Sequence, residues 1–285
     1  MNEEKLPPVV GSKSFTAVAI NCAAKAGEWI KIKLGSVENL ELKYSSADLV
    51  TEIDKGSERL IKKLIGTHFP NHAFLGEEGV EPGAAASSKA IADTNDAEYL
   101  WIVDPIDGTT NFVHGFPFFC VSIALAYKGE VIVAVIYDPM KDELFVAERG
   151  KGAYVHGKRL VVSQDATLQQ SLIATGFPAD QIYALPLNMK SLQHIAPKVR
   201  NIRVSGSAAL HMAYVAAGRL SGFWEMNLNS WDLAAGSLLI QEAGGLVTDI
   251  DGSPYTLEVR NVVASNGIIH SQFIDELQKS LQTSE

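Results

Sequence analysis

The stretch Trp101-Ile102-Val103-Asp104-Pro105-Ile106-Asp107-Gly108-Thr109-Thr110-Asn111-Phe112 decides how this chain is interpreted. The apolar run at residues 100–103 has the length and β-branched content of a buried strand, and the Asp-Pro step predicts its end. Asp104 and Asp107 lie three residues apart across a turn stiffened by proline, so both carboxylates can converge on one cation. The glycine that follows permits close backbone approach, and the two threonines offer hydroxyl and N–H groups to an anion. The stretch therefore predicts a place where metal and phosphate meet.

Asp-Pro and Asp-Gly steps are also ordinary turn chemistry, so one copy alone indicates only a loop. Two further segments accompany it in this chain: Gly76-Glu77-Glu78-Gly79 upstream and Trp231-Asp232-Leu233-Ala234-Ala235-Gly236 downstream. In this order the three segments resemble the inositol monophosphatase family of Mg²⁺-dependent phosphatases, and the resemblance extends from about Phe15 to Asp275. It implies an α/β (α+β) fold, the layered αβαβα sandwich of the inositol monophosphatase and fructose-1,6-bisphosphatase type.

Composition narrows the class of protein. A chain of 285 residues with 47% hydrophobic and 20% charged residues is typical of a globular protein with a sizeable core. The net charge of −9 argues against nucleic-acid binding, which depends on neutralising phosphates. Cys22 and Cys120 lack neighbours at zinc spacing, which favours reduced thiols. No apolar stretch is long enough to span a bilayer, so we expect a soluble cytoplasmic protein.

Hydrophobic periodicity predicts the elements and two linked halves, one at about residues 10–165 and the other at about 166–285. Helices are expected at 14–33 and 55–66, followed by an antiparallel meander whose short strands lie at 120–127, 130–137, 143–149 and 152–155. The Ala-, Ser- and Gly-rich segment 81–97 is typical of a mobile surface loop. In the second half we expect strands at 171–175, 201–204, 223–225 and 262–264, and helices at 185–195, 207–217, 233–243 and 268–281.

The resemblance implies a site that holds two or three Mg²⁺ ions. Glu77, Asp104 and the carbonyl of Ile106 would hold the first ion, and Asp104 would bridge to a second that is also held by Asp107 and Asp232. Carboxylate and carbonyl oxygens are the ligands that Mg²⁺ prefers, and a pair of ions can stabilise both the attacking and the leaving oxygen of a phosphate ester.

The implied catalytic residues are Glu77, Thr109 and Asp54. A threonine hydroxyl that is hydrogen-bonded to a carboxylate accepts a proton from water more readily, so Thr109 and Asp54 would activate the nucleophile. Simpler interpretations exist: Asp54 can cap the helix that begins near it, and Thr109 can be an ordinary turn residue. Asp48 belongs to the same segment of the family pattern but is a weaker candidate.

Substrate contacts are predicted at two further places besides Asp107, Gly108 and Thr109. Gly206-Ser207-Ala208 opens a helix whose N–H groups can face an anion, although a serine there also serves as a plain cap. Glu225 lies in a segment similar to the family segment that binds substrate hydroxyls. Because a buried, unpaired glutamate is unfavourable, a polyol ligand or an arginine should satisfy it.

Other catalytic patterns are weaker. His114 and His211 are expected to be structural histidines, and Trp231 is expected to pack. The chain has no Gly-x-Ser-x-Gly elbow of a serine hydrolase, and Gly150-Lys151-Gly152 lacks the spacing of a P-loop.

The expected activity is therefore hydrolysis of a small phosphorylated metabolite, with inositol monophosphate first. Related families act on fructose 1,6-bisphosphate, histidinol phosphate, 3'-phosphoadenosine 5'-phosphate or NADP, and those substrates remain alternatives. A regulatory role is a second alternative, because some bacterial relatives contact the transcription machinery. The resemblance further implies sensitivity to lithium and a homodimer.

Overall fold

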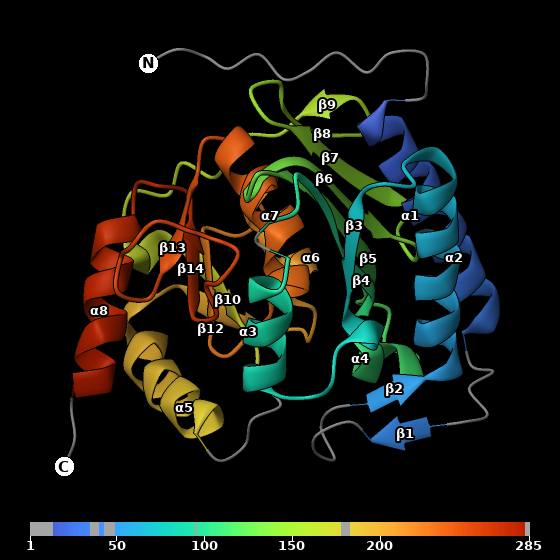
Figure 1. Ribbon diagram of the computed structural model, residues 1–285. Helices are drawn as coiled ribbons and strands as arrows, with labels where there is room; N and C mark the ends of the chain where they lie inside the picture. The colour runs from blue at the N-terminus through green and yellow to red at the C-terminus, as the bar shows by residue number, and fades with distance from the viewer. Residues whose placement is uncertain (1–13, 35–39, 43–48, 95, 178–182, 283–285) are drawn as a thin grey trace.

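The computed structural model describes residues 14–34, 40–42, 49–94, 96–177 and 183–282 (Figure 1). Asp48 lies outside the described residues. No helix in these ranges is both long and apolar enough to cross a lipid bilayer.

Two sheets organise the described residues. The larger one runs in the order β3 (Ala73–Gly76), β4 (Tyr99–Asp107), β5 (Cys120–Tyr127), β6 (Glu130–Asp138), β7 (Glu143–Glu148), β8 (Gly152–Val155), β9 (Lys158–Arg159). All its neighbouring strands are antiparallel except the parallel pair β3 and β4, which confirms the predicted meander. The smaller sheet is mixed and has the order β11 (Asn201–Val204), β10 (Leu172–Thr175), β12 (Gly222–Glu225), β14 (Val262–Ser265), β13 (Leu246–Asp249).

Helices cover both faces of each sheet and give the predicted layers (Figure 1). α1 (Phe15–Lys33) and α2 (Glu52–His68) pack on the outer face of the larger sheet. α6 (Ala208–Ala216) and α7 (Ser230–Glu242) lie between the two sheets, while α5 (Ala184–Ile195) and α8 (His270–Gln282) pack on the outer face of the smaller one. The order helix, sheet, helix, sheet, helix is the αβαβα sandwich.

The alternation of side chains along the strands explains why each sheet has a layer of helices on both of its faces. In β4, Leu100 and Ile102 face the helices between the sheets, whereas Trp101 and Val103 face α1 and α2. Successive side chains of a strand point to opposite faces, so a strand that is apolar at every position requires a layer on each side.

Four differences from the sequence prediction concern the site. β4 does not end at the Asp-Pro step but continues to Asp107, and a five-residue helix, α4 (Thr109–Val113), follows at once. α7 begins at Ser230 rather than Leu233, and α2 begins at Glu52. The expected loop 81–97 contains a helix, α3 (Ala84–Ala92), because its alanines favour a helix once Ser87 and Ile91 are buried.

The remaining described elements are small. They are β1 (Leu40–Leu42), which pairs with β2 (Leu49–Thr51), and three 3₁₀ turns at Glu77–Gly79, Leu168–Gln170 and Ala196–Lys198.

His211 on α6 is buried between two aromatic rings. Its ring centroid lies 5.3 Å from that of Phe118 and 5.3 Å from that of Phe223, and neither ring nitrogen has a hydrogen-bond partner among the described residues. Burial lowers the pKa of His211 to about 4. His211 is therefore a structural, neutral histidine, as predicted, whose protonation the folded protein resists.

We expect His211 to make the protein less stable in acid. Its unfolded-state pKa is near 6.5, so the unfolded chain takes up the proton first and stability falls as the pH drops from about 6.5 towards about 4. Between pH 7.5 and 5.0 this loss amounts to about 2 kcal/mol. Urea unfolding at both pH values should show a smaller loss in His211→Leu than in the unaltered protein. Equal losses in the two proteins would contradict this explanation.

Candidate active site

Three carboxylates meet where the larger sheet approaches α7. One oxygen from each of Asp104, Asp107 and Asp232 lies within 4.8 Å of the others, and all three side chains are buried. Carboxylate oxygens this close repel one another strongly in the absence of a cation. This cluster is the arrangement that the sequence predicted for a metal site.

A β-bulge explains how two residues of one strand reach the same place. In a regular strand, residues three apart point to opposite faces of the sheet. Here Asp104 pairs with Ser122 and Asp107 pairs with Cys120, so β4 uses one more residue than β5 across this interval. The carboxylate of Asp104 is held in the bulge, because its Oδ1 accepts a hydrogen bond of 2.9 Å from the N–H of Ile106.

Asp232 reaches the cluster from the first turn of α7. The backbone N–H of Asn229, the residue at the start of this helix, donates to Asp232 Oδ2 at 2.7 Å. A carboxylate in the first turn is also favoured by the helix dipole. The helix start thus orients one oxygen of Asp232 and leaves the other for the cluster.

Asp107 is held by the start of α6. Its Oδ2 accepts hydrogen bonds from Ser207 Oγ at 2.6 Å and from the N–H of Ala209 at 2.7 Å, and Ser207 Oγ also accepts from Leu210 N at 3.3 Å. Contact of Ser207 and Ala208 with the substrate stays a prediction, because these bonds engage the start of α6 with Asp107. The N-terminus of α6 faces a protein carboxylate, and neither residue is part of the cavity lining described below.

Thr109 lies beside Asp54, as the resemblance implied. The hydroxyl oxygen of Thr109 is 3.0 Å from Asp54 Oδ1 and 3.0 Å from the carbonyl oxygen of Ile106. A hydroxyl has one proton, so it can donate to only one of these acceptors at a time. A cation on the carbonyl of Ile106 would direct that proton to Asp54, which would leave the lone pairs of the hydroxyl free to accept a proton from water.

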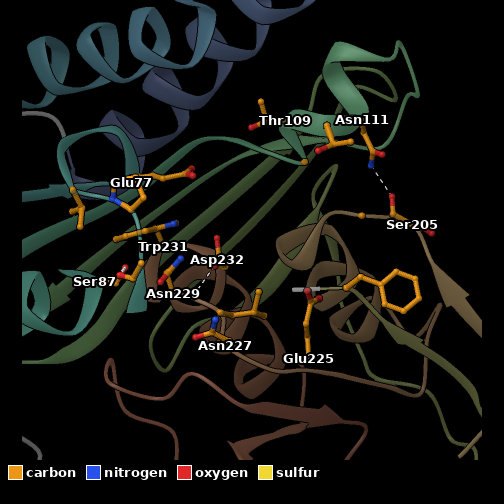
Figure 2. Close-up of a pocket in the computed structure, with 18 of the residues that line it drawn as sticks. Glu77, Ser87, Thr109, Asn111, Ser205, Glu225, Asn227, Asn229, Trp231 and Asp232 are labelled. Carbon is orange, nitrogen blue, oxygen red and sulfur yellow. Dashed lines mark hydrogen bonds between the residues drawn. The ribbon is translucent and has the colours of Figure 1, made fainter. Parts of the chain in front are cut away.

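A cavity of about 510 Å³ opens above the cluster (Figure 2). Figure 2 shows Glu77, Thr109, Asp232 and Glu225 around it, where Glu77 and Thr109 are far in sequence from the segment that carries Glu225 and Asp232. Of the predicted site residues, the lining includes Glu77, Gly108, Thr109, Gly206, Glu225 and Asp232. The structure therefore brings most of the predicted substrate contacts to one opening, whereas Asp54, Asp104, Ile106 and Asp107 are not part of the lining.

Glu225 ends β12 as a buried carboxylate on this cavity. Among the described residues no hydrogen bond reaches its oxygens, so the arginine considered above does not supply a partner there. Gly176 leaves room for this side chain, since a Cβ at Gly176 would lie 2.0 Å from Glu225 Oε2. The carboxylate is thus free to accept from a ligand with hydroxyl groups.

Burial and mutual repulsion favour protonation of the acidic cluster. Burial first, and then the charges of Glu77, Asp107 and Asp232, raise the pKa of Asp104 well above its ordinary value. Burial and the charges of Asp107 and Glu77 do the same for Asp232, and burial and the charges of Asp232 and Asp107 do so for Glu225. The pKa of Asp107 rises to about 6, because burial outweighs its hydrogen bonds from Ser207 and Ala209. A bound cation would replace these protons.

The residues fit a hard divalent cation. Three carboxylates, a fourth on Glu77 and the carbonyl of Ile106 supply oxygen donors. The thiol of Cys120 lies 3.8 Å from Asp107 Oδ2, but burial raises its pKa well above the ordinary value, so it stays a neutral thiol rather than a thiolate ligand for a softer metal. Together, the αβαβα fold and an acidic cluster beneath an open cavity define a metal-dependent phosphatase.

Comparisons with known proteins identify the family. The model of the inositol monophosphatase family matches residues 12–282, and the chain belongs to this family of phosphoric monoester hydrolases. It is 42% identical to the Nus factor SuhB of Pseudomonas aeruginosa, over 94% of this chain and 97% of that protein. It is 43% identical to inositol monophosphatase 2 of Solanum lycopersicum, over 94% and 99%. A solved Thermotoga maritima IMPase has a TM-score of 0.82, with 36% identity, 93% of this chain and 97% of that chain covered.

The sequence analysis missed polar residues of the cavity wall. Asn111 lines the cavity and donates from Nδ2 to the carbonyl oxygen of Ser205 at 2.7 Å (Figure 2). Its Nδ2 also donates to the carbonyl oxygen of Phe118 at 2.7 Å. Asn227 and Asn229 line it between Glu225 and Asp232. A local signal existed only for Asn229, since an Asn followed three residues later by Asp at a helix start is close to a capping box.

We expect Asp107→Asn to stabilise the metal-free protein and to weaken its response to metal. Because folding raises the pKa of Asp107, the folded protein binds the proton more readily, and stability falls as the pH rises from about 4 through about 6. The amide removes this penalty, which is worth about 1 to 3 kcal/mol near pH 7.5. Urea unfolding in EDTA should show the gain, and added Mg²⁺ should raise the melting temperature of the unaltered protein alone. The exposed Asp93→Asn is the control; a loss of stability in Asp107→Asn would contradict the account.

Proposed function

We propose that this protein hydrolyses inositol monophosphate to inositol and phosphate with Mg²⁺ as its cofactor, two or three ions per site. The observation that carries the proposal is the convergence of Asp104, Asp107 and Asp232 beneath a cavity that also contains the carboxylates of Glu77 and Glu225. The three aspartates offer the oxygen ligands that a hard cation prefers, and Glu225 can accept hydrogen bonds from the hydroxyl groups of a polyol. A relative named inositol monophosphatase, 43% identical over almost its whole length, supports the same substrate.

In the proposed reaction the residues of the site have separate roles. When bound, Mg²⁺ supplies positive charge to the phosphate oxygens and makes water more acidic. Asp104, Asp107, Asp232, Glu77 and the carbonyl of Ile106 would hold the ions. Thr109 takes the proton of the attacking water and relays its own to Asp54, since both groups lie 3.0 Å apart. Glu77 faces the cavity and orients that water, while Gly108, Gly206 and Glu225 line the space for the substrate.

Other phosphorylated metabolites remain alternatives within this reaction class. A cavity of about 510 Å³ admits larger ligands than a cyclitol phosphate. Fructose 1,6-bisphosphate, histidinol phosphate, 3'-phosphoadenosine 5'-phosphate and NADP belong in the same test.

A panel of these phosphate esters, assayed for phosphate release with and without Mg²⁺, tests the activity. We expect Mg²⁺-dependent release that is fastest from inositol monophosphate, is inhibited by Li⁺, and falls by at least about 10³-fold in Asp104→Asn, which removes a charged ligand from the cluster. Hydrolysis that is undiminished in Asp104→Asn would defeat the metal assignment. Preference for another ester would change the substrate and leave the reaction intact.

A regulatory role is the second candidate function. The observation that favours it is the relative named Nus factor SuhB, which is 42% identical to this chain. All the acidic residues of the site are present, so a binding role would be added to catalysis rather than replace it. The Asp104→Asn protein separates the two: loss of phosphate release with retained binding to the transcription machinery would show two roles. No binding by either protein would remove this candidate.

We propose also that the protein is a cytoplasmic homodimer. Exposed apolar side chains outside the cavity lining are available to a partner, among them Ile32, Val161, Leu187 and Tyr183. The two cysteines are unpaired and buried, as expected in a reducing compartment. Light scattering should give twice the mass of the chain; a monomer at micromolar concentration would contradict the proposal.

A further inference from the structure

The connection between β12 and α7 forms one wall of the cavity. It begins after Glu225, contributes Asn227, Leu228 and Asn229 to the lining, and leads within three residues to Asp232 (Figure 2). Any shift of this connection would therefore move Glu225 and Asp232 relative to each other. Asn227 has a left-handed backbone conformation, with φ of 60°, which a non-glycine residue adopts only when its surroundings hold it there.

Arg260 holds this connection from the segment that precedes β14. Its Nη2 and Nε donate to Asn227 Oδ1 at 2.8 and 3.3 Å, and Nη2 also lies 3.3 Å from the carbonyl oxygen of Asn227. Its Nη1 donates to Asn229 Oδ1 at 2.8 Å. A planar guanidinium can make these bonds at once, because its five N–H groups have a fixed geometry.

The backbone completes the attachment. Leu228 N donates to the carbonyl of Arg260 at 2.9 Å, and Asn227 N donates to Asn261 Oδ1 at 3.1 Å. Pairing of β12 with β14 places Glu225 opposite Val262, so residues 37 apart in the sequence are brought face to face. The network then reaches the acidic cluster, because Asn229 N donates to Asp232 Oδ2 at 2.7 Å.

Arg260 itself does not line the substrate cavity. It lines a neighbouring cavity of about 390 Å³, and its hydrogen bonds reach the substrate side through Asn227 and Asn229. Its positive charge also acts directly on Asp232, whose pKa it lowers against the larger effect of burial.

We propose that Arg260 is a positioning residue that holds Asp232 and Glu225 at a fixed position relative to each other. It thereby sets the affinity of the site for its cation and for its polyol substrate. This inference rests on the proposed function. Residues that orient a metal ligand typically change metal affinity by about 10- to 100-fold when they are replaced. A purely structural arginine would lower stability and leave these affinities unchanged.

Direct Mn²⁺ binding to the substrate-free protein, followed by electron paramagnetic resonance of the free ion, tests the proposal. We expect Arg260→Gln to weaken Mn²⁺ binding by about 10- to 100-fold. Arg260→Lys should bind Mn²⁺ almost as weakly as Arg260→Gln, because an ammonium group cannot reproduce the fixed set of hydrogen bonds that a guanidinium donates. Arg219→Gln is the matched control: Arg219 binds Glu143 by a similar double contact and lines neither cavity, so Mn²⁺ affinity should not change.

A second pair of variants keeps Arg260 in place. Asn227→Gly retains the left-handed conformation but removes the acceptor, and it should weaken Mn²⁺ binding and raise KM as Arg260→Gln does. Asn227→Asp retains an acceptor for the guanidinium, so it should keep most of the Mn²⁺ affinity of the unaltered protein. The double variant Arg260→Gln with Asn227→Gly should be no worse than Arg260→Gln alone, since the acceptor on Asn227 acts only while the guanidinium is present.

The outcomes separate this inference from the proposed function. If the unaltered protein binds no Mn²⁺, the proposed metal-dependent function fails. If it binds Mn²⁺ and both Arg260→Gln and Asn227→Gly bind it equally well with the same KM, the proposal for Arg260 is overturned. Should Arg260→Gln fail to fold, Asn227→Gly alone decides, because its backbone needs no rearrangement.

Discussion

Repulsion among buried carboxylates is the constraint on which the rest of the site depends. The oxygens of Asp104, Asp107 and Asp232 come within 4.8 Å of one another, with Asp104 and Asp107 buried beneath the cavity that Asp232 lines. Carboxylates in such a place must take up protons or share cations. Holding these carboxylates together therefore lowers the stability of the metal-free fold, and a bound cation would neutralise their charge. Functional sites commonly reduce stability in this way.

Each acidic residue has its own structural support. The bulge in β4 brings Asp104 and Asp107 to one side of the strand, the start of α6 binds the second oxygen of Asp107, and the start of α7 orients Asp232. Both helices lie between the two sheets, where packing on either side fixes them. The layered packing thus holds the N-termini of α6 and α7 at the end of β4. Rigid supports of this kind keep ligands in place before the cation arrives.

Much of this was predictable from the sequence, because the decisive signals are local. Apolar runs gave the strands of the meander, and the three acidic segments gave the family, the layered fold and the residues of the cluster. The bulge was not predictable, since it depends on pairing between Asp104 and Ser122 and between Asp107 and Cys120. For the same reason the bond between Ser207 and Asp107 was not predictable, since the two residues lie 100 positions apart. Arg260 carried no local signal at all: its partners are 31 and 33 residues distant.

The most direct test of the central claim is anomalous diffraction from crystals grown with Mn²⁺. Mn²⁺ takes the same oxygen ligands as Mg²⁺ and can be located by its own scattering. The account predicts anomalous peaks in contact with the carboxylates of Asp104, Asp107 and Asp232, at the floor of the cavity that Glu225 borders. Crystals in which these three carboxylates point apart, or in which Mn²⁺ binds only elsewhere on the chain, would contradict it.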